Sequence, residues 1–122
     1  MAQNNLNSKQ IPQQRWLEFF DMFGDGNRGR TIAIEVINQE IGDEELIKDA
    51  PLMSIVYDPP EKDNNLAIET GKDEVNYAHN ITAPTEVWEA QDENGEVVAL
   101  EIKDESGTKT ILRLERWTSV NN

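Results

Sequence analysis

The C-terminal third of the chain, residues 84–117, reads PTEVWEAQDENGEVVALEIKDESGTKTILRLERW. Two polar segments ending in glycine divide it, Asp92-Glu93-Asn94-Gly95 and Asp104-Glu105-Ser106-Gly107, and apolar and polar residues alternate beyond each of them. Alternation with a period of two is typical of a strand with one buried face, and such turns join antiparallel neighbours. This stretch therefore predicts a three-stranded antiparallel meander.

The details of the meander also follow from residue types. Asn94 and Gly95 both tolerate the positive φ of a two-residue type I′ turn, and Gly107 is expected to be left-handed in the second turn. The side chains predicted to face the core are Val98, Leu100, Ile102, Thr110, Leu112 and Leu114. Arg113 and Glu115 then face solvent, which sets the register.

An amphipathic helix is predicted near the start of the chain. It begins around Pro12, which fits the first turn of a helix, and Gly24 is expected to end it. Its apolar side is formed by Trp16, Leu17, Phe19, Phe20 and Phe23. A face this broad must be covered, and the concave side of the sheet is the available surface.

Short strands are expected between the helix and the meander. They cover residues 31–37, 45–48, 52–57, 66–69 and 75–81. Pro51 cannot donate a ladder hydrogen bond, so a bend or a sheet edge is expected there. The prediction is an α+β domain, mainly β, with the helix packed on a curled antiparallel sheet or a partly open small β-barrel. Residues 11–117 form this domain, and residues 1–10 and 118–122 are expected to be disordered tails.

Composition excludes several classes of function. The chain has no cysteine, so disulfides, thiolate metal sites and a cysteine nucleophile are impossible. Its 24 acidic and 11 basic side chains give a net charge of −13, which disfavours contact with nucleic acid or an anionic membrane. No long apolar run and no signal peptide are evident, so a cytoplasmic protein is expected. No cofactor is expected either.

His79, the only histidine, is the main candidate for chemistry. With Tyr77 and Asp58 it would form a general acid–base site for a small molecule or a hydrolytic reaction. A lone histidine on a strand is more often a hydrogen-bonded structural residue, and the serines lie in no nucleophile-elbow context.

Two acidic segments are candidates for weak binding of Ca²⁺ or Mg²⁺. One contains Asp58, Glu61 and Asp63, and the other contains Asp43, Glu44 and Glu45. The alternative is that these carboxylates are solvated turn residues, which is the commoner role of a charge run.

Trp88 is the candidate for protein docking. It follows Val87 directly, and neighbouring residues on a strand face opposite sides of the sheet. If Val87 enters the core, Trp88 faces outward, where tryptophan is a frequent interface anchor. The alternative is that Trp88 packs on the helix or on a terminal segment.

Residues 11–115 resemble a family of small bacterial proteins classed as a domain of unknown function. The residues that carry the resemblance are Ile11-Pro12, Trp16, Phe20, Asp49, Pro51, Leu52, Ile55, Asp58, His79, Pro84-Thr85, Val87, Leu100-Glu101-Ile102, Gly107-Thr108, Thr110 and Leu112. The resemblance implies no activity, cofactor or catalytic residue. The family pattern often has a second histidine shortly before the position of His79, where this chain has Tyr77, which argues against a two-histidine metal site. The missing nucleophiles, the single histidine and the acidic surface lead us to expect a non-catalytic interaction or accessory module with a protein partner.

Overall fold

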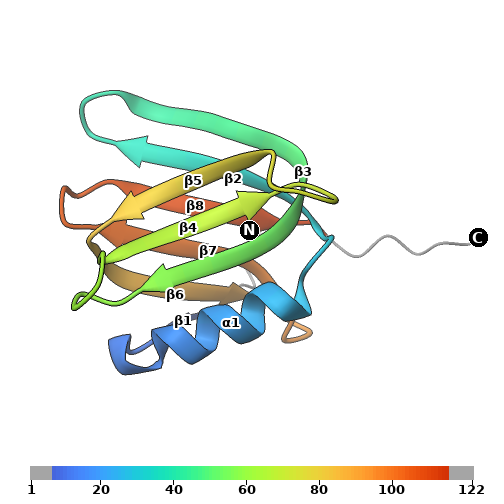
Figure 1. Cartoon of the computed structure of the whole chain (residues 1–122), viewed down its shortest axis with the longest axis horizontal. Coiled ribbons are helices and arrows are strands. Elements are labelled where there is room, and N and C mark those ends of the chain that lie inside the picture. Colours follow the sequence, from blue (N-terminus) through green and yellow to red (C-terminus); the bar gives the residue numbers. More distant parts are fainter. Residues whose placement is uncertain (1–6, 116–122) are drawn as a thin grey trace, which may run out of the picture.

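The computed structural model describes residues 7–115, which form one helix and an eight-stranded antiparallel sheet (Figure 1). The strands are β1 (Asn7–Gln10), β2 (Thr31–Asn38), β3 (Gly42–Asp58), β4 (Asn65–Thr70), β5 (Tyr77–Thr82), β6 (Pro84–Gln91), β7 (Val97–Asp104) and β8 (Lys109–Leu114). A 3-10 turn, η1 (Gln13–Arg15), leads into the helix α1 (Trp16–Gly26). The predicted mainly-β α+β fold and its C-terminal meander are confirmed.

The sheet is curled but not closed. Its strand order is β1-β6-β7-β8-β2-β3-β4-β5, so β1 and β5 are the two edges. The long strand β3 turns the sheet over on itself, because its first part pairs with β2 and its last part, from Leu52 onward, pairs with β4. In Figure 1 the layer of β3, β4 and β5 consequently lies over the layer that contains β6, β7 and β8.

Pro51 lies at the point where β3 changes partners. The two short strands expected on either side of it are parts of one strand, which is the main error in the predicted strand boundaries. Asp49 has a positive φ of 55°, and the β2–β3 register shifts near this point. The bend predicted at Pro51 is therefore present, but it redirects the strand instead of ending it.

The core lies between the two layers of strands. Its fully buried apolar side chains come from both layers: Ile32, Ile34, Leu52, Leu66, Ile68, Val87, Leu100, Ile102 and Leu112. Thr110 and Leu114 are buried as predicted, whereas Val98 is only half-buried. Burial from both inner faces makes this arrangement a two-layer packing of one bent sheet.

The helix α1 packs on the second part of β3. The stripe spaced by four and three residues, Trp16, Phe20 and Phe23, is buried. The Trp16 ring meets the Tyr57 ring edge-on, with centroids 5.5 Å apart. Leu17 is 51% exposed, so its predicted place on the buried face is wrong, because it points about 100° away from Trp16.

Gly24 does not end the helix, which continues to Gly26. A Cβ atom at Gly24 would lie 3.2 Å from the backbone nitrogen of Ile55. The glycine is therefore needed for the close approach of α1 to β3, and its role is packing instead of helix termination.

The two turns of the meander have the same geometry. Gly95 and Gly107 have φ values of 83° and 89°, and their N–H groups donate to the carbonyl oxygens of Asp92 and Asp104. Asn94 has no positive φ, so the predicted two-residue type I′ turn is wrong. The Asp92 carboxylate accepts hydrogen bonds from the backbone N–H groups of Asn94 and Glu96, which stabilises a longer turn.

The N-terminal segment forms an unexpected strand. Asn7–Gln10 pair with β6, so the disorder predicted for residues 1–10 is wrong for these four residues. All four are exposed, which explains why they carry no hydrophobic pattern. The remaining residues of the predicted tails, 1–6 and 118–122, and Trp117 lie outside the described residues.

Candidate functional site

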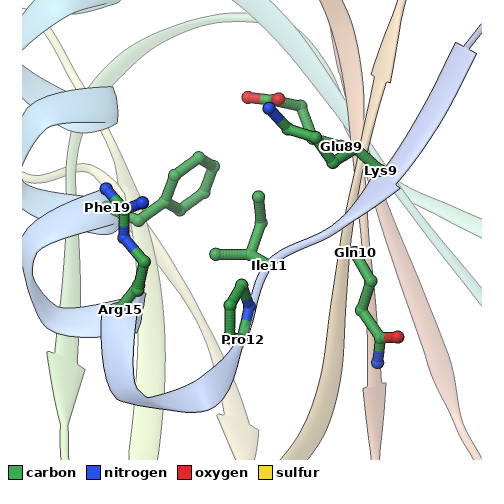
Figure 2. Close-up of a pocket in the computed structure, with 7 residues that line it drawn as sticks. All are labelled: Lys9, Gln10, Ile11, Pro12, Arg15, Phe19 and Glu89. Carbon is green, nitrogen blue, oxygen red and sulfur yellow. The ribbon is translucent and has the colours of Figure 1, made fainter.

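A pocket of about 430 Å³ opens between β1, β6 and the start of α1 (Figure 2). Its lining residues are Lys9, Gln10, Ile11, Pro12, Arg15, Phe19 and Glu89. The chain turns sharply at Ile11-Pro12, between the edge strand and the helix. This turn is held by the Trp16 indole N–H, which donates to the Ile11 carbonyl oxygen at 2.8 Å, and by the Ile11 N–H, which donates to the carbonyl oxygen of Val87.

Glu89 is the buried charged group of this pocket, with 8% of its surface exposed. The side-chain amide of Gln91 donates a hydrogen bond to one of its carboxylate oxygens at 3.1 Å. Lys9 lies directly opposite Glu89 in the β1–β6 pairing. Within residues 7–115, however, the structure shows no ion pair between Glu89 and either cation of the pocket.

The other pocket residues supply a second charge and an apolar wall. Arg15 is exposed and forms an ion pair with Glu18 at 3.0 Å. The half-buried Phe19 ring stacks on Phe23 at a centroid distance of 5.7 Å. Figure 2 shows the Phe19 ring, the Ile11 side chain and the Glu89 carboxylate around one hollow.

Glu89 was not among the residues predicted to form a site, although its position in the strand carries a signal. Val87 is fully buried, and residues two apart on a strand face the same side. The alternation that places Val87 in the core therefore also turns Glu89 inward. This inward register is the signal that would have singled out Glu89, whereas the pocket also needs β1, which has no apolar residue to mark it.

His79 lies at the other end of the inner face. Tyr77, His79 and Ile81 share the inner side of β5, as alternation requires, and the His79 Nε2 atom lies 3.2 Å from the Thr110 hydroxyl on β8. Burial lowers the pKa of His79 below its ordinary value, and the nearby charge of Asp104 opposes this shift. His79 is thus a largely neutral group between the two layers at pH 7.

The structure does not bring Asp58 to His79. The β3–β4 and β4–β5 pairings align Ile55 with Ile68 and His79, whereas Asp58 aligns with Asn65 and Thr82. Two strand spacings and three residues along the strand separate the Cα atoms of Asp58 and His79 by roughly 14 Å. Asp58 also faces away from the core, because its neighbour Tyr57 is buried.

Asp104, whose charge acts on His79, already accepts hydrogen bonds from other groups. One carboxylate oxygen of Asp104 accepts hydrogen bonds from the Ser106 N–H, the Ser106 hydroxyl and the Thr108 N–H. The Asn38 amide in turn donates to the Thr108 hydroxyl at 2.7 Å. These bonds fix the β7–β8 turn, so the polar groups at this end satisfy one another.

The acidic segments do not converge. In the part of the chain from residue 7 to residue 115, no group of three or more His, Cys, Asp or Glu side chains has a geometry that would hold a metal ion. The segments around Asp58 and Asp43 therefore supply no assembled site for Ca²⁺ or Mg²⁺.

Trp88 faces outward from β6. Val87 is fully buried, and Trp88 is half-buried on the opposite face, where its indole N–H donates to Glu86 at 2.9 Å. Its cross-strand neighbours are Gln10 on β1 and Glu101 on β7. Trp88 thus packs partly beside a terminal segment, and α1 does not cover it, because the helix packs on β3.

Ion pairs run across the same outer face of the sheet. They join Lys103 to Glu86 at 4.0 Å, Lys109 to Glu101 at 3.3 Å, and Arg113 to Glu35. The pKa of Glu35 is held below its usual range by two contacts. They are a side-chain hydrogen bond with Asp43 and the interaction with Arg113. This face therefore combines one aromatic side chain with paired charges of both signs.

A family model described as a family of unknown function, DUF5335, matches residues 7–122. The chain belongs to this family. An uncharacterized protein of Aquifex aeolicus (strain VF5) is 31% identical over 108 residues, which cover 88% of this chain and 92% of that protein. No solved structure matches the chain. The family match covers both the outer face around Trp88 and every residue that lines the pocket.

Proposed function

We propose that the protein is a non-catalytic cytoplasmic interaction module that docks a protein partner on the outer face of β6, β7 and β8, with Trp88 as the anchor. The observation that carries this proposal is the outward, half-buried indole of Trp88 on a sheet face that α1 leaves uncovered. Antiparallel sheets tolerate one solvated face, and an aromatic side chain on such a face supplies the apolar centre of an interface.

The charges around Trp88 support docking of a protein. Glu86 and Glu101, which pair with Lys103 and Lys109, lie next to Trp88 on the outer face, so both signs of charge stand near the indole. A polar rim of this kind gives specificity and register, while the buried aromatic gives most of the affinity. The net charge of −13 favours partners with a basic contact surface over nucleic acid or anionic lipid.

Other features support a non-catalytic role. The residues first considered for acid–base chemistry, His79, Tyr77 and Asp58, do not share one pocket, since Asp58 lies on the opposite face of the sheet. Within residues 7–115 no helix has the length and apolar character needed to cross a membrane. The aromatic side chain and the mixed charges of the outer face lead us to expect another protein as the partner that docks there.

Capture of partners from a cell lysate tests the proposal. Immobilised protein should retain a specific partner, and Trp88→Ala should weaken that binding by about 30-fold or more, which corresponds to an interface anchor worth about 2 kcal/mol. The matched control is Leu17→Ala, which removes another exposed apolar side chain, from α1. Full binding by folded Trp88→Ala, or equal loss in both variants, would exclude this surface.

A further inference from the structure

The pocket between α1 and the β1–β6 pair presents three kinds of chemistry at once. They are the carboxylate of Glu89, the cations Lys9 and Arg15, and an apolar wall. Pockets of roughly 300–1,000 Å³ with apolar walls and a few converging polar groups are the usual form of small-molecule sites. The volume of about 430 Å³ falls in this range.

Glu89 lacks a cationic partner. Only the Gln91 amide donates to it among the side chains of residues 7–115, although an ionised carboxylate can accept about four hydrogen bonds. Glu89 as a residue is only 8% exposed, and a carboxylate in a buried residue is costly unless it is paired. A primary ammonium group, with three N–H donors, is the ligand group that satisfies this position.

The cations of the pocket select a second ligand group. Lys9 is exposed, lies opposite Glu89 in the β1–β6 pairing and forms no ion pair in the described part of the chain. Among the described residues, Arg15 pairs with Glu18 in an exposed ion pair, and pairs of that kind are weak enough for the guanidinium to bind a ligand instead. A ligand carboxylate placed beside its own ammonium group would meet these cations.

The apolar wall selects the rest of the ligand. Ile11, Pro12 and Phe19 line the side of the pocket nearest to α1 (Figure 2). The Phe19 ring also offers its π-system to a nearby ammonium group. A lone amine would be repelled by Lys9 and Arg15, and a lone carboxylate would be repelled by Glu89, so neither matches the whole site.

We infer that this pocket binds a free α-amino acid with an apolar side chain. Its ammonium group pairs with Glu89, its carboxylate pairs with Lys9 and Arg15, and its side chain packs on Phe19 and Ile11. This inference goes beyond the proposed docking function and does not depend on it, because it concerns the opposite side of β1.

Titration of the full chain with L-phenylalanine, followed by two-dimensional NMR of the backbone amides, tests the inference. We expect saturable shifts confined to residues 9–19 and 87–91. Phenethylamine, which lacks the carboxylate, and 3-phenylpropanoate, which lacks the ammonium, should each bind about tenfold more weakly or worse. Equal binding of all three probes would overturn the inference, as would the absence of saturation at millimolar amino acid.

Variants assign the ligand groups. Glu89→Gln should reduce affinity for L-phenylalanine by about tenfold or more, because an amide cannot pair with the ammonium as an ion. Lys9→Met, at an exposed position, tests the other half of the site should Glu89→Gln fold poorly. Glu61→Gln, at an exposed position between β3 and β4, is the control and should bind as the parent does. Unchanged affinity in both pocket variants would overturn the inference, even if Trp88 proves to be a docking residue.

Discussion

The two ends of the inner face contrast in how their polar groups are satisfied. At one end His79 contacts Thr110, and the carboxylate of Asp104 accepts three hydrogen bonds from its own turn. At the other end Glu89 is more deeply buried, yet within residues 7–115 it accepts a hydrogen bond only from Gln91, and it faces a pocket. His79, the only histidine in the chain, has a polar contact within the fold. Glu89 belongs to a common residue type, yet its carboxylate has hydrogen-bond acceptors left for another molecule.

This contrast teaches that rarity in the sequence is a poor guide to availability. A lone histidine attracts attention because histidine titrates near neutral pH, but the turn and the second layer occupy the groups around it. A buried carboxylate with few donors is a costly group that a fold retains where another molecule completes it. Substitutions of Trp16, His79 and Glu89 distinguish the two ends by how much each one changes the free energy of unfolding.

The largest effect on stability is expected at Trp16, in the helix beside the pocket. Trp16→Ala should lower the free energy of unfolding by about 3–5 kcal/mol, because it removes a large buried side chain and leaves a cavity. It also removes the indole bond to the Ile11 carbonyl, so the turn that forms the pocket loses its tether. Urea denaturation followed by circular dichroism measures the change.

Leu17→Ala is the control for this measurement. Leu17 is adjacent in sequence but 51% exposed, and its truncation should change stability by only about 0.5 kcal/mol. A loss below about 1 kcal/mol for Trp16→Ala would show that α1 is not part of the core.

At the His79 end we expect a smaller effect, a dependence of the free energy of unfolding on pH. Because burial lowers the pKa of His79 in the folded protein, the unfolded chain binds this proton first as the pH falls below about 6.5. The contribution of neutral His79 is therefore present above this pH and is lost as the pH falls toward the folded pKa. Unfolding free energies measured at several pH values between 7.5 and 5 should decline less steeply for His79→Gln than for the parent. Parallel curves for the two proteins would show that His79 is not buried between the layers.

The smallest effect on stability is expected at the pocket end. Glu89→Gln replaces an incompletely bonded carboxylate by a neutral group of the same shape, and such exchanges are nearly neutral or slightly stabilising. The free energy of unfolding should stay within about 0.5 kcal/mol of the parent or rise. Chemical denaturation at pH 7 checks this value. A loss of about 2 kcal/mol or more would mean that Glu89 is satisfied within the chain, which would remove the contrast between the two ends.

Much of the fold follows from local patterns in the sequence. Leu100, Ile102 and Leu112 are buried because alternation in the meander leaves them no other side, and Trp16, Phe20 and Phe23 are buried because their spacing forms one helical stripe. Trp88 faces outward for the same reason that Val87 is buried. These outcomes depend on neighbours in sequence, so no knowledge of the tertiary structure is needed to predict them.

The remaining features depend on contacts between distant segments. Gly24 leaves room for the backbone of Ile55, which lies close to it, and β3 continues through Pro51, where β4 replaces β2 as its partner. The strand β1 has no apolar residue and is held only by pairing with β6, so no periodicity marks it. The pocket escaped prediction for this reason, since β1 forms one of its walls.

The two sides of β1 serve two different surfaces of the molecule. Lys9 points into the pocket, and the next residue, Gln10, stands beside Trp88 on the outer face. A molecule that holds this four-residue strand in place from one side therefore also orders the neighbour of the tryptophan on the other. If both proposals hold, the cost of ordering β1 is met once, so we expect occupancy of the pocket to strengthen docking at Trp88 and docking to strengthen occupancy.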